Sequence, residues 1–599
     1  MSESFIRVEK PKRKLLNPEY IPTPLVTSGE RPPIKVVGLK EHRRLSGFTV
    51  VMRFIAFGLR ILFRKLQGRG ENAQRSAVEA RELFQGLGGL WIKLAQFLSL
   101  RTDLFSVEMC KELSQTLYSN IGFPAEIAKK TIERELGSPL EAIFSSFEDQ
   151  PLAAASIAQV HRAVLRKEGV PVVIKLLRPN VIEAFRRDMG LLHLLVGLLG
   201  ILMPLRHLRL NEALDELNGM VEEELNYTYE TSNCRQLRKV LRRHKVYVPY
   251  VFRSYCTEKV LVMEEISGVL MSDAIAVNSS NPKHFEAWCE ENLVQPKKVA
   301  THLFMSNMRQ LLEDNLFHGD MHPGNILLLR NNRYALIDFG TIGSLNPGFL
   351  QIYLAVLRAI NRREWDRAAS LSLHLCVELP SFEIDKLRVE LVNAFKLWMA
   401  RSEFDSLSYH ERSLGASSKI IGQVFMKYNL QINWAALRMG RTWGTLDTSL
   451  AYFYPEMNHA KMFSRYIRDA QRRKQKNRIA NFREGLVQVL DSANQYRVLL
   501  EPVLQKATIT YKQKINKLSL IFATIMRFIY ISLILLLGFV VHVYLHQRFP
   551  GIGDYPGAAL AKIVPMIEDK WFALTVFAVI MVSVLLRRLI KIVSASYLR

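Results

Sequence analysis

Three short motifs, arranged in one order, constrain the fold of this chain more than any other feature. Residues 317–325 read FHGDMHPGN, in which Asp320 and Asn325 have the spacing D-x-x-x-x-N, and the tripeptide Asp-Phe-Gly follows at 338–340. In kinase-type phosphoryl-transfer sites the first aspartate orients the attacking hydroxyl, and the asparagine and second aspartate bind Mg²⁺ through hard oxygen atoms. Two unrelated surface turns could give either fragment alone. Their order predicts Asp320 as a catalytic residue and Asn325 and Asp338 as metal ligands.

The third motif lies upstream and supplies a phosphate-binding lysine. Residues 172–175 read VVIK and fit the V-A-I-K strand pattern, in which the lysine contacts the α- and β-phosphates of ATP. A lysine beside three β-branched residues is otherwise typical of a strand end at the surface, but its place before the other motifs favours Lys175 as a catalytic lysine. A glutamate on a helix must hold such a lysine, and Glu222, Glu223, Glu224 and Glu230 are available.

Two further segments are candidate nucleotide contacts. Residues 262–268 (VMEEISG) occupy the place of a hinge that offers backbone groups to adenine, which makes Glu264 and Ile266 candidates. No G-x-G-x-x-G precedes Lys175, and residues 153–161 read AAASIAQVH instead. Because alanine keeps a Cβ atom, this loop has less conformational freedom than a glycine loop, and its amides approach phosphates less freely. The candidate loop residues are Ala153, Ala154, Ala155, Ser156, Ile157, Ala158, Gln159 and Val160.

With these motifs the sequence resembles the UbiB (aarF-type) family of atypical protein-kinase-like proteins, which is linked to ubiquinone and other isoprenoid-quinone biosynthesis. The alanine-rich loop, the HGDxHPGN motif and a K-x-G-Q motif, here Lys93-Leu94-Ala95-Gln96, carry the resemblance. It covers about residues 75–350 by motif and extends to 470 by general pattern. It implies a bilobal kinase fold whose N-terminal extension covers the cleft, binding of Mg²⁺ and ATP, and small-molecule or lipid-linked chemistry. It also implies isoprenoid-quinone intermediates, or the enzymes that make them, as partners.

The chain departs from the family pattern at two positions. Ala95 replaces the glycine of K-x-G-Q, and the family's E-x-D motif reads Glu224-Leu225-Asn226. Asparagine carries no charge and cannot act as a base, so the role of that aspartate in nucleotide or metal handling is in doubt. Aligned on this segment, Glu230 is the expected partner of Lys175 and Glu224 that of Lys93. Lys93, Gln96, Glu224 and Glu230 therefore join the candidate cofactor-binding residues.

Two apolar runs near the C-terminus predict a membrane hairpin. Residues 528–545 and 571–586 contain no Asp, Glu, Lys or Arg. At about 1.5 Å per residue the first crosses a hydrocarbon core of about 30 Å, whereas the second must extend to Ile592 with Arg587, Arg588 and Lys591 snorkelling. Lys512, Lys514 and Lys517 precede the hairpin, so the positive-inside rule predicts a multi-pass membrane protein with a cytoplasmic kinase-like domain, in the inner membrane if bacterial. A hairpin buried in protein is the less favoured alternative.

The net charge of 81 − 56 = +25 predicts an anionic partner. Basic residues concentrate in segments 42–70 and 461–483 and beside the hairpin, which favours anionic membrane lipid, and no motif supports nucleic acid. Residues 48–66 predict a helix with Arg53, Arg60 and Arg64 on one face. An interfacial membrane helix and an ordinary packed helix explain it equally well. Residues 189–205 lack charges, but Pro204 and their place between motifs favour a core helix over a membrane span.

Together these features predict an α+β chain with a bilobal protein-kinase-like fold, a helical N-terminal extension and a C-terminal transmembrane helical hairpin. The five cysteines show no CxxC spacing, which indicates reduced thiols. Residues 1–16 lack the apolar core of a secretory signal. The chain could form a homodimer, and the sequence does not decide this. The predicted organisation is a mobile leader (1–47), the extension (48–147), an N-lobe (148–270), a C-lobe (271–470), a basic helical linker (471–516) and the hairpin (517–592).

Two other functions stay open beside a kinase or ATPase with an unknown substrate. A pseudokinase scaffold that uses nucleotide as a structural switch is consistent with Asn226 and with the alanine-rich loop. A small-molecule phosphotransferase of the aminoglycoside or choline class shares the H-G-D-x-x-x-x-N loop, but the alanine-rich loop, Lys93–Gln96 and the hairpin argue against it. The residues do not distinguish phosphate transfer from hydrolysis and do not identify the quinone.

Overall fold

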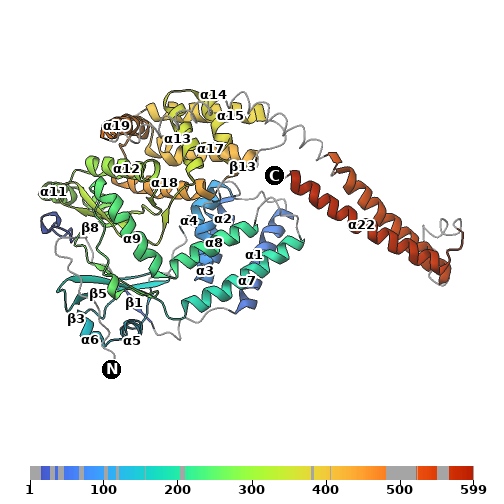
Figure 1. Ribbon diagram of the computed structural model, residues 1–599, viewed down its shortest axis with the longest axis horizontal. Helices are drawn as coiled ribbons and strands as arrows, with labels where there is room; N and C mark the ends of the chain where they lie inside the picture. Colours follow the sequence, from blue (N-terminus) through green and yellow to red (C-terminus); the bar gives the residue numbers. More distant parts are fainter. Residues whose placement is uncertain are drawn as a thin grey trace. The chain divides into compact units, whose positions relative to one another are not determined.

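The computed structural model of the chain forms two units (Figure 1). The first contains residues 1–377 and 388–471, and the second contains residues 378–387 and 472–599. The structure describes residues 15–26, 34–37, 46–66, 73–99, 101, 105–115, 121–155, 157–202, 210–378, 384–404, 406–428, 430–432, 434–480, 521–522, 524–549 and 565–597.

An antiparallel sheet forms the smaller lobe of the first unit. Its strand order is β3-β5-β6-β7, with β4 paired to β5. Side chains alternate along β6, so Val172, Ile174 and Leu176 are buried on one face against helices α5 and α6, while Lys175 lies on the other face. The strands are β3 (Phe144–Phe147), β4 (Ala153–Ala154), β5 (Ala158–Leu165), β6 (Pro171–Leu177) and β7 (Val260–Glu264), and the helices are α5 (Ala125–Leu136) and α6 (Leu140–Ile143).

Helices that precede this sheet, and helices that lie between its strands β6 and β7, surround the smaller lobe. The helix predicted at 48–66 is present as α1, and the Lys93–Gln96 motif lies on α3. Phe54 of α1 packs against Phe84 of α2 and Trp91 of α3, which fastens α1 to the unit. These helices are α1 (Gly47–Leu66), α2 (Ala73–Leu87), α3 (Leu90–Leu98), α4 (Val107–Ser114), α7 (Val181–Leu202), α8 (Leu210–Glu224) and α9 (Tyr227–Leu241).

Part of the predicted mobile leader is held against the unit. The amide of Leu16 donates to Glu264 Oε1 (2.7 Å), the amide of Thr23 donates to Asn292 Oδ1 (2.9 Å), and the ring of Tyr20 lies 3.8 Å below the Arg333 guanidinium. Apolar packing of Leu16 and Tyr20 beside strand β10 (Ile326–Leu329) explains why this stretch is fixed. Short strand β1 (Lys35–Val36) pairs with β2 (Ile121–Gly122). Leader residues 1–14, 27–33 and 38–45 lie outside the described residues.

The larger lobe is helical and carries a small sheet with the order β11-β10-β8. Strands β9 and β12 pair with each other and bring the loops at 317–325 and 338–340 together. The strands are β8 (Val269–Leu270), β9 (Phe317–His318), β10 (Ile326–Leu329), β11 (Arg333–Leu336), β12 (Ile342–Gly343), β13 (Cys376–Glu378) and β14 (Gln431–Ile432). The helices are α10 (Met271–Ser280), α11 (Pro282–Glu291), α12 (Pro296–Leu312), α13 (Pro347–Asn361), α14 (Trp365–Leu373), α15 (Ile384–Glu403), α16 (Tyr409–Arg412), α17 (Leu414–Lys427), α18 (Trp434–Phe453) and α19 (His459–Ala480).

The uncharged segment 189–205 falls mostly within α7. Met189 and Leu192 are buried, but Leu194 is exposed, so α7 contributes one face to the core instead of being wholly enclosed. Residues 203–209, with Pro204, lie outside the described residues. The predicted basic linker at 471–516 begins within α19, and its residues after Ala480 lie outside the described residues.

The second unit contains two apolar helices, Thr524–Arg548 and α22 (Asp569–Tyr597). They form a hairpin in which Tyr544 stacks on Phe572 with ring centroids 3.7 Å apart and Arg548 pairs with Asp569 at 2.6 Å. The apolar window of α22, Asp569–Ile590, begins before the predicted run and is long enough to cross a membrane. Lys512, Lys514, Lys517 and the loop between the helices at 550–564 lie outside the described residues.

Asn226, the residue that departs from the family's E-x-D motif, caps α9. Its Oδ1 accepts the amide of Thr228 at 2.9 Å and so satisfies one free N–H of the first helical turn. We expect Asn226→Ala to destabilise the first unit by about 1 kcal/mol, and Asn226→Asp to be neutral, because both Asn and Asp accept this bond well. Thermal unfolding of the full chain in detergent measures both, and equal destabilisation by Asp and Ala would contradict the capping role.

Candidate nucleotide-binding and phosphoryl-transfer site

Lys175 is the centre of an ionic cluster in which Glu230 is buried and Asp338 is partly exposed. Its Nζ lies 2.9 Å from both carboxylate oxygens of Glu230 on α9 and 3.5 Å from Asp338 Oδ1. The ring of Tyr227, the first residue of α9, lies 5.5 Å from the same ammonium group. Burial alone would lower the pKa of Lys175, but the two carboxylates raise it well above its usual value, so the side chain is charged. The contact predicted between Lys175 and Glu230 is present.

Asp338 is held in a strained backbone conformation beside this cluster. Its φ of 65° is in the left-handed region, which a residue with a Cβ atom seldom adopts. Oδ1 accepts the amide of Gly340 at 3.1 Å. Desolvation would raise the pKa of the Asp338 carboxyl, but the Lys175 ammonium and the Gly340 amide lower it to about 2. Asp338 therefore presents a carboxylate at neutral pH.

The tripeptide at 338–340 is also fastened to α9. The amide of Phe339 donates to Glu230 Oε1 at 3.2 Å, and Asn233 Nδ2 donates to the Phe339 carbonyl at 3.1 Å. Glu230 thus contacts both the strand lysine and the loop that carries Asp338. A displacement of α9 would change the positions of both groups together.

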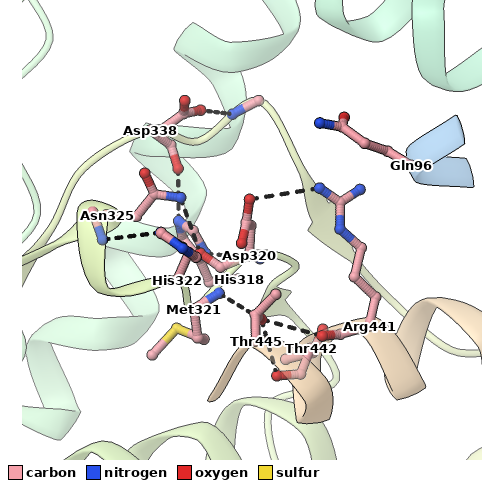
Figure 2. Close-up of polar contacts among 12 residues, drawn as sticks. Gln96, His318, Asp320, Met321, His322, Asn325, Asp338, Arg441, Thr442 and Thr445 are labelled. Carbon is pink, nitrogen blue, oxygen red and sulfur yellow. Dashed lines mark hydrogen bonds and ion pairs between the residues drawn. The ribbon is translucent and has the colours of Figure 1, made fainter. Parts of the chain in front are cut away.

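His318 joins the two loops of the site (Figure 2). It is completely buried, and burial lowers the pKa of its ring, which is therefore neutral at physiological pH. Its Nε2–H donates to the carbonyl of Asp338 at 2.6 Å, and its Nδ1 accepts the amide of Asp320 at 3.2 Å. One neutral tautomer satisfies both bonds, so His318 sets the distance between the backbones of Asp320 and Asp338.

Asn325 and Asp338 offer suitable ligands for Mg²⁺. The side-chain amide Nδ2 of Asn325 donates to the Asp320 carbonyl at 3.2 Å, and the Asn325 carbonyl accepts the amide of Ile337, next to Asp338. Within the described part of the chain, no partner is recorded for Asn325 Oδ1, and no group of three or more His, Cys, Asp or Glu forms a metal cluster. Two hard oxygen donors without an all-protein cage fit an ion that phosphate oxygens and water complete.

The N-terminal extension reaches the same region through α3. Lys93 Nζ lies 2.6 Å from Glu224 Oε2 at the end of α8, so the second predicted pairing is also present. Figure 2 shows the Gln96 side chain facing the space between Asp338 and the loop at 317–325, which we call the catalytic loop. The roles of Lys93, Glu224 and Gln96 toward a nucleotide stay predictions.

The alanine-rich loop is a tight turn, and some of its polar groups are already used in hydrogen bonds within the protein. The Ala155 amide donates to the Ala158 carbonyl at 2.9 Å, so it is used within the turn, and Arg178 Nε donates to the Ala155 carbonyl at 2.8 Å. Gln159 is fully buried, and its side-chain amide binds both backbone groups of Phe123. We therefore correct one expectation: the Gln159 side chain supports the lobe and is not available to a nucleotide. Ser156 lies outside the described residues.

The hinge candidates are held by structural contacts. The Glu264 side chain is buried and accepts hydrogen bonds from the Leu16 amide, the Tyr247 hydroxyl and the Tyr250 amide. Its carboxylate therefore fixes the hinge and is not free to contact adenine. Ile266 packs beside the small sheet of the larger lobe, and its carbonyl accepts the amide of Gly268 at 3.0 Å.

Helix α18 contributes residues that the sequence reasoning missed. Arg441 Nη2 lies 3.5 Å from Asp320 Oδ2, and Thr445 Oγ1 accepts the amide of Met321 at 2.9 Å (Figure 2). Ser449 Oγ donates to the Met321 carbonyl at 2.5 Å. Thr445 lies 124 residues beyond Met321 and belongs to no motif, so no local sequence signal marks these contacts.

A cavity opens beside the catalytic loop. Its walls come from α3, α8, α18 and the segment that follows Asp338-Phe339-Gly340. They combine apolar side chains such as Phe97 and Trp434 with the charged groups of Glu223, Arg438 and Arg441. Gly319, the residue before Asp320, and Arg441, which pairs with Asp320, both line this cavity.

The comparisons with known proteins agree with this geometry. The family model of the ABC1 atypical kinase-like domain matches residues 117–372. The protein named "Probable protein kinase UbiB" from Tolumonas auensis is 34% identical over 319 residues, which cover 52% of this chain and 56% of that protein. The protein of the same name from Edwardsiella ictaluri is 35% identical over 340 residues, covering 56% of this chain and 60% of that protein. The chain thus spans less than two thirds of the length of these relatives.

Among solved structures, the complex of Rv3197 with erythromycin from Mycobacterium tuberculosis aligns with 69% of this chain and 99% of its own, at 22% identity and a TM-score of 0.41. The family match, together with the sheet and the helical lobe, confirms the predicted α+β kinase-like fold. Residues 117–372 thus match an ABC1 atypical kinase-like domain, and over about half of its length the chain is similar to proteins named UbiB.

Proposed function

We propose that this chain is a membrane-anchored atypical kinase or ATPase that binds Mg²⁺ and ATP and supports isoprenoid-quinone biosynthesis or the handling of its lipid intermediates. One observation carries the enzymatic part: Lys175, Glu230 and Asp338 meet in one ionic cluster, and His318 ties the Asp338 backbone to that of Asp320. Phosphoryl-transfer sites need these groups in fixed positions because most of their catalysis is positioning and electrostatic stabilisation.

Each residue then has a distinct proposed role. Lys175, charged and held by Glu230, donates hydrogen bonds to phosphate oxygens. Asp320 accepts the proton of the attacking hydroxyl or water. Asn325 and Asp338 hold Mg²⁺, which when bound neutralises negative charge on the phosphates. The cavity beside Asp320 receives a small or lipid-linked acceptor, and whether phosphate is transferred or hydrolysed depends on what occupies it.

The membrane part of the proposal is supported by the hairpin of the second unit. Only 6% and 11% of the residues in its two apolar windows are buried within the protein. Helices as apolar as these are not stable when exposed to water. Because the described residues do not enclose them, we expect lipid to surround them. The cytoplasmic side for the kinase-like domain follows from the basic residues that flank the hairpin.

The first prediction concerns the pair Lys175–Glu230. In a double-mutant cycle with Lys175→Met and Glu230→Gln, we expect a coupling of about 1–3 kcal/mol in the free energy of ATP binding, because each group is buried with the other as partner. Calorimetric titration of the full chain measures it. Lys427→Met and Glu390→Gln, which break a pair whose lysine is exposed, form the control cycle and should show no coupling. Zero coupling at Lys175–Glu230 would remove this pair from the nucleotide site.

The second prediction separates the two aspartates. Asp320→Asn should lower ATP turnover by at least about 100-fold while ATP affinity is kept, because it removes only the proton acceptor. Asp338→Asn should abolish Mg²⁺-dependent nucleotide binding. Turnover with anionic liposomes and lipid extract measures both effects, with Asp366→Asn on the exposed surface of α14 as the control. A fully active Asp338→Asn enzyme would contradict the catalytic assignment. A wild-type chain that binds ATP without turning it over would favour the pseudokinase scaffold.

The third prediction concerns α18. Arg441→Ala should lower turnover by about tenfold without changing ATP affinity, because Asp320 then loses the cation that orients its carboxylate. Arg438→Ala is the matched control: Arg438 lines the same cavity and pairs with Glu216 (2.6 Å), which lies on α8. Equal losses in the two variants would assign Arg441 a general role in the cavity instead of a positioning role at Asp320.

A further inference from the structure

Helix α1 has two apolar faces, and among the described residues only one of these faces packs against the first unit. The inner face carries Val50, Phe54 and Phe57, which pack against the core of the unit. We define the outer stripe as Phe48, Met52, Ile55, Leu59 and Phe63. With about 3.6 residues per turn, these positions form one line along the side of α1 opposite to the inner face.

The outer stripe is strongly exposed. Phe48 is 75% exposed, Leu59 58% and Phe63 63%, and the two other members are each exposed by nearly half. A packed surface helix normally turns polar side chains to water on this side. Because every member of the stripe is a large apolar residue, the stripe requires a partner that excludes water.

The charges around the stripe identify the partner. Residues 42–70 contain seven Lys or Arg and no acidic residue. Within α1, Arg53 and Arg60 are exposed at one flank of the stripe, and their recorded hydrogen bonds go only to backbone carbonyls. Arg64, in contrast, is paired with Glu79 at 2.7 Å. An apolar line bordered by cations matches a bilayer surface, in which acyl chains lie beneath anionic headgroups.

Helix α7, which packs beside α1, also exposes an apolar side chain. It lies against α1, where Gly47 approaches Leu191, and its Leu194 is 58% exposed. The remaining residues from 189 to the end of α7 include no Asp, Glu, Lys or Arg. Helix α1 and the part of α7 from residue 189 onward thus contain no acidic group that would repel anionic lipid.

We propose that the outer stripe of α1 is a docking surface for an anionic lipid bilayer and lies in its interface, parallel to the membrane plane. The inference uses the proposed function only in that the hairpin brings a bilayer close to the chain. It adds a second membrane contact, made by the first unit itself. Because Phe54 on the inner face packs against Trp91 of α3, this contact would fix the orientation of the helix that carries Lys93.

The test uses the full chain in lipid nanodiscs with an environment-sensitive fluorophore on Leu59→Cys. The five native cysteines are buried or half-buried, and the unsubstituted chain serves as the labelling blank. In discs of phosphatidylglycerol and phosphatidylcholine, we expect emission to shift to the blue and spin-labelled lipid to quench it. The matched reporter on Glu286→Cys, exposed on α11, should stay accessible to aqueous iodide. Discs of phosphatidylcholine alone should give clearly weaker quenching, because the cationic flank then has no anionic partner.

A second comparison places a charge on the helix without unfolding it. With the reporter at Ile55→Cys, Leu59→Glu should reduce quenching by lipid about tenfold, whereas Gly58→Glu, on another side of α1, should change it little. Both sites project from the unit, so thermal midpoints should stay near that of the parent chain.

Each other outcome overturns the proposal in a distinguishable way. A chain in discs whose stripe remains open to iodide overturns the docking surface but leaves the hairpin anchor intact. A chain that does not enter discs overturns both. Equal quenching in neutral and anionic discs overturns the assignment to anionic lipid. If the reporter is protected from iodide in detergent alone, and this protection grows with protein concentration, the stripe contacts a second copy of the chain instead of lipid.

Discussion

The ion pair of Lys175 and Glu230 is the interaction on which the arrangement of the site depends. Glu230 is 3% exposed and receives both the lysine ammonium and the amide of Phe339, so one carboxylate connects β6, α9 and the loop of Asp338. A buried ion pair contributes little net stability, although loss of one partner costs about 3–5 kcal/mol because a buried charge remains. Its effect is therefore to permit only one arrangement of three elements.

A second set of contacts makes the catalytic loop dependent on distant parts of the chain. His318 connects the loop to the backbone of Asp338, while Thr445 and Ser449 hold both backbone groups of Met321. The loop is thus held by the segment that carries Asp338 and by α18. Arg441 adds a charge contact to Asp320 from the same helix. Helix α18 consequently belongs to the site although none of its residues lies in a motif.

The sequence predicted those parts of the site that depend on local spacing. Periodicity predicted strand β6 and helix α1, and motif order predicted the order of the loops. Alignment with the family pattern predicted the pairings of Lys175 and Lys93. Arg441 and Thr445 could not be predicted, because a helix far along the chain reaches the loop only through tertiary packing. The buried role of Gln159 was missed for a related reason: its partner is the backbone of Phe123, which carries no sequence signal. The fixed segment at 15–26 was missed because its three prolines resemble those of a free leader.

That N-terminal segment has a mechanical consequence. Leu16 is bonded to Glu264 at the end of β7, whereas Thr23 is bonded to Asn292, next to α11 in the larger lobe, and Trp288 Nε1 donates to the Thr23 carbonyl. A few residues therefore bridge the two lobes on the hinge side. Rotation that opens the cleft would have to stretch this bridge or break its hydrogen bonds. Wide opening of the two lobes therefore costs these hydrogen bonds, whereas small movements of the alanine-rich turn or of α3 do not.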